Sequence, residues 1–138
     1  MKLSKNFSLS ELVHPDIIAK VGNRSADFLH PMAVGTLQAL RDEFGSITVN
    51  GMFNGQVFKD SGLRLPHGHV GANLSSQKFG CGFDLKFSNR KPIEVQNHII
   101  LNQSDYPYIT RIENALVTKT WLHLEIGERT NSIKVFNP

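Results

Sequence analysis

Two residues of the types that bind catalytic metals, Asp84 and His123, stand in two separate stretches of alternating apolar and polar residues. Alternate side chains of a β-strand share a face, so each residue projects from the face opposite its strand's apolar side chains. If the strands are neighbours, the carboxylate and the imidazole meet over the sheet. They are two of the three protein ligands that a catalytic zinc needs, with water in the fourth position. Periodicity alone favours the simpler outcome, a His–Asp hydrogen bond on a solvated sheet face.

The elements that precede these strands are predicted to be helical. Residues 8–11 (Ser-Leu-Ser-Glu) form a capping box that starts a short helix. Pro15 breaks or restarts this helix, which runs on to about Val21. A second helix is predicted from Pro31, which suits a first helical turn, to Gly45, which is a natural stop.

The later part of the chain predicts strands around one more helix, at 92–102. The predicted strands are 46–50, 82–87, 108–113, 120–126 and 133–136. The stretch between 51 and 82 is rich in Gly, Asn, Ser, Pro and His, so we expect a mostly irregular, functional segment there. We therefore expect an α+β fold, with a mainly antiparallel sheet and helices packed on one side. The residues expected in its core are Leu37, Leu40, Phe44, Phe83, Leu85, Leu122, Leu124 and Ile126.

The length, charge and cysteine content of the chain limit the kinds of partner and fold that we expect. The 138 residues suit a single domain, and the formal charge of +3 includes no run of Lys or Arg. Nucleic acid is therefore not the expected partner, whereas an anionic polymer such as cell wall is compatible with the charge. The one cysteine, Cys81, allows no intrachain disulfide. No apolar run reaches the length of a signal peptide or of a membrane span, so we expect synthesis in a cytoplasm and no membrane insertion.

The ten residues that end at Asp84 (Ser-Ser-Gln-Lys-Phe-Gly-Cys-Gly-Phe-Asp) form the first part of a family resemblance. They resemble the S-x-H-x-x-G-x-A-x-D motif of zinc D-Ala-D-Ala carboxypeptidases and L-Ala-D-Glu endopeptidases. Ser75, Gly80 and Asp84 match the motif, and Gly82 stands at its alanine. Gln77 stands at its histidine.

Three other segments follow the layout of the same family, in the same order. Residues 120–125 (Thr-Trp-Leu-His-Leu-Glu) resemble its closing strand, W-x-H-x-D. Residues 61–64 (Ser-Gly-Leu-Arg) look like its S-G-x-R, and residues 7–12 look like its first helix. Phage-borne members share this layout, and the resemblance spans about residues 7 to 126.

The resemblance implies a fold, a cofactor and a set of site residues. The fold would be the small Hedgehog-like α+β type, whose sheet lines a zinc cleft. The positions of the zinc ligands are Asp84, His123 and Gln77, and the substrate-binding residues are Arg64 and Ser75. The arginine of the family motif holds a carboxylate or an amide oxygen of the substrate.

One departure concerns the metal. A glutamine amide is neutral and a poor ligand for Zn²⁺, so we expect zinc binding to be weakened or absent. His67 and His69 could replace the missing ligand, or they could simply belong to an exposed loop. Cys81 could bind metal as a thiolate. It should instead share the direction of Phe83 into the core.

A second departure concerns the general base. Relatives place Glu or Asp three residues before the last zinc histidine, where this chain has Thr120. Glu125 shares a strand face with that histidine, and Glu113 belongs to the preceding strand. Either could activate a water, with Glu125 the first choice. Glu113 could equally be a buried partner of an arginine, Arg64 or Arg111.

Three functions remain open from the sequence. The first is a phage-type, peptidase-like protein with an impaired zinc site, which binds wall peptides or serves as a structural part of a virion among other phage proteins. The second is an active zinc peptidase that cleaves peptidoglycan stem peptides. The third is an unrelated small binding protein that shares the pattern by chance. For the first two, synthesis in a bacterial host cytoplasm and a place in the virion are the implied locations.

Overall fold

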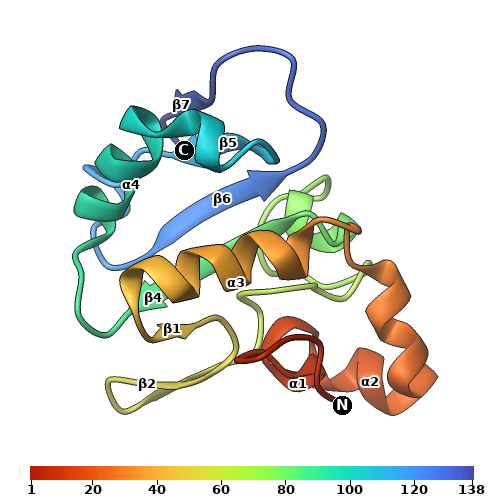
Figure 1. Cartoon of the computed structure of the whole chain (residues 1–138). Coiled ribbons are helices and arrows are strands. Elements are labelled where there is room, and N and C mark those ends of the chain that lie inside the picture. Colours follow the sequence, from red (N-terminus) through yellow and green to blue (C-terminus); the bar gives the residue numbers. More distant parts are fainter.

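The computed structural model describes all of residues 1–138 and stacks helices on one face of a five-stranded sheet (Figure 1). The strand order is β1-β4-β6-β5-β7. All neighbouring pairs are antiparallel except β5–β7, which is parallel. The strands are β1 Ile47–Thr48, β4 Gly82–Phe87, β5 Ile109–Glu113, β6 Leu122–Ile126 and β7 Lys134–Phe136. The α+β class and the mainly antiparallel sheet are therefore confirmed.

The helices begin and end close to the predicted residues. They are α1 Leu9–Leu12, α2 Pro15–Val21, α3 Ala33–Phe44 and α4 Pro92–Leu101, with 3-10 turns η1 Gly22–Phe28, η2 Ser76–Phe79 and η3 Gln103–Asp105. The predicted capping box is present: Glu11 accepts hydrogen bonds from both the backbone N–H and the hydroxyl of Ser8. Gly45 ends α3 with φ of 82°, a conformation that favours glycine.

One apolar layer joins α3 and α4 to the sheet. The ring of Phe44 on α3 lies 6.2 Å from that of Phe87 on β4 and 5.0 Å from that of His98 on α4. Both helices therefore pack on the same side of the sheet, as expected. All eight residues predicted for the core are buried. Each buried Leu or Phe side chain contributes about 1.5–3 kcal/mol through the hydrophobic effect, so this layer is the main source of stability.

The segment 51–82 is mostly irregular, as expected, but it contains a β-hairpin that was not predicted. Strands β2 Gly51–Phe53 and β3 Gln56–Phe58 pair with each other and with no other strand. Asn54 and Gly55 join them with φ of 48° and 78°. Positive φ at both central residues is typical of the type I′ turn that Asn-Gly favours, so this dipeptide was the available signal for the hairpin. The longest stretch of the segment without a helix or strand is 59–75.

Candidate functional site

Asp84 and His123 face each other directly across β4 and β6. They are register partners in the antiparallel pair, and His123 Nδ1 lies 2.8 Å from Asp84 Oδ1. The alternation of both strands sends their apolar side chains into the core and leaves these two groups together on the other face. The predicted adjacency on one face of the sheet is therefore confirmed.

His123 is surrounded by hydrogen-bond acceptors. Its Nε2 lies 3.5 Å from Glu125 Oε1 and 3.5 Å from the hydroxyl of Ser76. Burial alone lowers the pKa of His123, but hydrogen bonds to Asp84 and Glu125 outweigh burial and raise that pKa from 6.5 to about 9. The side chain is therefore an imidazolium at neutral pH, with both ring nitrogens acting as donors.

Gln77 completes the cluster as a hydrogen-bond donor. Its side chain is 2% exposed, and its Nε2 donates to the Asp60 carbonyl at 3.0 Å and to Asp84 Oδ2 at 3.5 Å. Because both neighbours can only accept, they fix the amide with its nitrogen toward the carboxylate. Only the amide oxygen of Gln77 could bind a cation, and it is the amide nitrogen that faces the carboxylate.

This donor set does not fit the tetrahedral zinc that the family resemblance implies. Zinc bonds of about 2.0–2.2 Å place neighbouring ligand atoms about 3.3 Å apart. The Asp84 and His123 atoms are 2.8 Å apart and bonded to each other. Zinc would have to displace a proton of the imidazolium, and the position of the third ligand holds an NH₂ group, which has no lone pair to give. The residues are arranged as a hydrogen-bonded ion pair.

Arg64 extends the cluster toward solvent. Its Nε donates to the Asp60 carbonyl at 2.7 Å, and one terminal nitrogen lies 3.5 Å from Asp84 Oδ2. These two contacts orient the guanidinium, whose side chain is 12% exposed. Its remaining N–H groups can pair with a carboxylate or a carbonyl oxygen of a ligand.

A cleft of about 590 Å³ opens beside Arg64 and Asp84. This volume is within the range of about 300–1,000 Å³ that is usual for ligand sites. One part of its lining comes from the β2–β3 hairpin, including Phe53 and Val57, and another from Trp121. The hairpin that periodicity missed is thus a wall of the cleft.

The two candidate bases differ in their surroundings. Glu125 pairs with His123 and, at 3.4 Å, with Arg111, and these contacts lower its pKa. A lowered pKa makes Glu125 a weak general base. Burial raises the pKa of Glu113, and no hydrogen bond ties its side chain. Arg64 and Arg111 pair with Asp84 and Glu125, so the alternative that Glu113 is their partner is wrong.

Other predicted residues lie outside the cluster. Ser75 caps η2, where its hydroxyl accepts from the Gln77 backbone N–H, and it does not line the cleft. His67 and His69 are exposed on the loop that follows Arg64, and no three His, Cys, Asp or Glu side chains converge as a metal-binding group. Cys81 is only half-buried, and its thiol contacts the Ser76 carbonyl. The expectation that Cys81 packs into the core is therefore wrong.

Lys86 is a further candidate site residue, which was not predicted from the sequence patterns. It is buried beneath the cleft, where its ammonium donates to the Ser61 hydroxyl at 2.7 Å and lies 4.2 Å from the Phe58 ring centroid. Burial lowers its pKa to about 8, although Asp84 opposes the shift. The available signal was its place two residues after Asp84, on the same strand face.

Comparisons with family models, with curated proteins and with solved structures found no match to this chain. None of its helices is long and apolar enough to cross a membrane.

Proposed function

We propose that this chain is a peptidase-like protein that binds peptidoglycan stem peptides without cleaving them efficiently. It would share the Hedgehog-like fold and the phage origin of the zinc D,D-carboxypeptidases and L-Ala-D-Glu endopeptidases that its motifs resemble. Support for the fold comes from the order of the motifs and from the antiparallel pairing of the strands that carry Asp84 and His123.

The observation that carries the proposal is the bonding between the would-be zinc ligands. Asp84 is held by His123 at 2.8 Å and contacted by the amide NH₂ of Gln77 at 3.5 Å. In the proposed ancestral site, a neutral imidazole at position 77 would bind zinc. Here the amide donates to the carboxylate, and the charge of Asp84 is neutralised by the imidazolium.

Peptide binding does not depend on the zinc ligands, so it is retained when zinc binding is lost. Arg64 keeps free N–H groups at the edge of the 590 Å³ cleft, and Lys86 adds a second cation to its lining. A peptide carboxylate or carbonyl can pair with Arg64, while the backbone of the peptide lies between the hairpin and Trp121. Hydrolysis would also need a general base, and the ion pairs of Glu125 make it a weak one.

The test combines zinc titration with peptide binding on the same samples. Wild type should bind a synthetic stem peptide, release no fragments from purified peptidoglycan, and bind zinc weakly in calorimetry. Gln77→His should bind zinc far more tightly, because imidazole completes a His–Asp–His set. The double variant Gln77→His/His123→Ala is the control and should lose that gain.

Two results would contradict the proposal. Tight zinc binding by wild type, together with digestion of peptidoglycan, would identify an active peptidase. A wild type that binds neither stem peptide nor intact peptidoglycan would remove wall binding and leave a purely structural role among virion proteins.

A further inference from the structure

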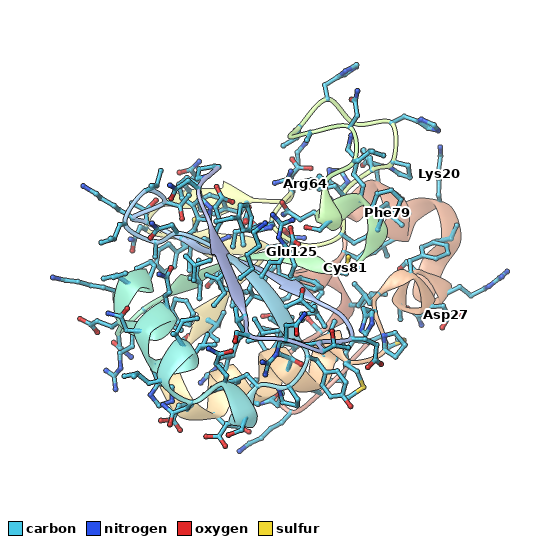
Figure 2. All side chains as sticks on the ribbon, turned by 90° about the horizontal axis from the view of Figure 1, so that it is seen from above. Lys20, Asp27, Arg64, Phe79, Cys81 and Glu125 are labelled. Atoms are coloured by element: carbon cyan, nitrogen blue, oxygen red, sulfur yellow. The ribbon has the colours of Figure 1, made fainter.

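A second cavity adjoins the cleft at Arg64. Its volume is about 350 Å³, and Arg64 is the one residue that lines both cavities. Figure 2 shows Arg64 beside Phe79, which belongs to the second cavity. The apolar residues of this lining are Ile17, Phe28, Leu63, Pro66 and Phe79. We call this second cavity the chamber. Because Arg64 lines both cavities, a ligand that pairs with Arg64 in the cleft lies next to the chamber.

A rigid backbone contact keeps two aromatic rings exposed at this chamber. Phe28 is 52% exposed and Phe79 is 63% exposed, although rings of this size are usually buried. The backbone N–H of His30 donates to the Gly80 carbonyl at 2.9 Å. A Cβ at Gly80 would lie 1.9 Å from the Phe28 carbonyl oxygen, so only glycine allows η2 to end against η1. The backbone contact between η1 and η2 therefore fixes the positions of Phe28 and Phe79 at the chamber.

The polar groups of the chamber are all cationic. Lys78 donates one hydrogen bond, to the Gly68 carbonyl at 3.0 Å, and its ammonium has three N–H groups. The lining contains no acidic residue, and Arg64 is its only other charged group. An occupant should therefore combine an apolar body with a negative charge at its end. A sugar fits poorly because the lining has no amide, hydroxyl or carboxylate side chain to pair with its hydroxyls.

We propose that this chamber, defined by Phe28, Phe79 and Lys78, binds a peptide side chain that consists of several methylene groups ending in a carboxylate. This inference rests on the proposed function. Among wall stem peptides, diaminopimelate has such a side chain, whose terminal carbon bears a carboxylate beside its ammonium, whereas lysine ends in an ammonium alone. The chamber thus selects diaminopimelate-type peptides over lysine-type peptides: the methylenes pack against the two rings, and the carboxylate pairs with Lys78.

The experiment is calorimetric titration with two synthetic stem tetrapeptides that differ only in diaminopimelate or lysine at the third position. Wild type should bind the diaminopimelate peptide at least about tenfold more tightly, since its carboxylate gains a charge-assisted hydrogen bond and offsets the repulsion between the side-chain ammonium and Lys78. Lys78→Glu should reverse the preference. Lys91→Glu, with the same charge change at an exposed position that lines neither cavity, should leave it unchanged. Phe79→Ala should weaken both peptides.

The outcomes separate this inference from the function on which it rests. Equal binding of both peptides by wild type, with loss of binding in Arg64→Gln, would overturn the side-chain preference and leave stem-peptide binding in place. An unchanged preference in Lys78→Glu would overturn the role of Lys78. Binding of a peptide-free glycan that Phe79→Ala abolishes would assign the chamber to a sugar and overturn the inference. No binding of either peptide by wild type would overturn the proposed function itself.

Discussion

The stability of this protein should fall as the pH rises from about 6.5 to 8, because folding raises the pKa of His123. The pKa of His123 is 6.5 in the unfolded chain and about 9 in the folded protein. A group whose pKa is raised by folding stabilises the folded state fully below its unfolded pKa. That contribution is lost as the pH rises through the folded pKa. The difference corresponds to about 3 kcal/mol.

Lys86 changes the stability in the opposite direction, and it does so at higher pH. Its pKa falls from 10.5 to about 8, because its ammonium is buried. This buried charge destabilises the folded state below pH 8 by about 3 kcal/mol, and the penalty is relieved between about pH 8 and 10.5. The range from pH 6.5 to 8 therefore reports on His123, and the wild-type curve should level off between about pH 8 and 9, where the two effects oppose each other.

Urea unfolding followed by far-UV circular dichroism measures both effects. Small proteins lose about 1–3 kcal/mol of stability per molar urea, so the loss of about 2 kcal/mol between pH 6.5 and 8 moves the midpoint by about 0.7–2 M. His123→Gln should remove the fall below pH 8, and Lys86→Met should remove the levelling above it. If wild type and His123→Gln show the same pH dependence between 6.5 and 8, the Asp84–His123 ion pair is not the source and the reasoning fails.

Two further predictions concern packing. Leu124→Ala should cost about 2–5 kcal/mol of unfolding free energy, because Leu124 is fully buried between sheet and helices. The matched change at the exposed Leu116 should cost under about 0.5 kcal/mol, and equal thermal melts for the two variants would contradict the assigned core. Gly80→Ala should destabilise the protein more than Gly55→Ala. Both glycines have positive φ, but only at Gly80 does the new Cβ meet backbone, the carbonyl of Phe28; similar melts would refute this contact.

Several features of the fold could be predicted because their signals lie within a few residues. The capping box at Ser8 and the stop at Gly45 are local hydrogen-bonding and φ requirements. The hairpin at 51–58 was missed because its strands have three residues each, too few for alternation to show. Its Asn-Gly turn was the stronger signal.

Part of the site could be predicted in the same way. Period-two alternation put Asp84 and His123 on the polar faces of their strands, and the residue types in β4 and β6 suggested the pairing that the structure has. The family resemblance pointed to Gln77, whose amide contacts Asp84. None of these patterns specifies whether a carboxylate and an imidazole bind a third group or bind each other.

The sequence by itself determined the fold class, the helix boundaries and which residues share a strand face, because backbone sterics and hydrophobic periodicity act over neighbouring positions. Only the tertiary structure decided the chemistry of those residues. The carbonyl of Asp60 fixes the amide of Gln77 as a donor, and the carboxylate of Asp84 raises the pKa of His123. The chamber next to Arg64 likewise depends on the contact between Gly80 and Phe28. These contacts join segments far apart in the chain, and their strength depends on burial and distance, which arise only when the whole domain packs.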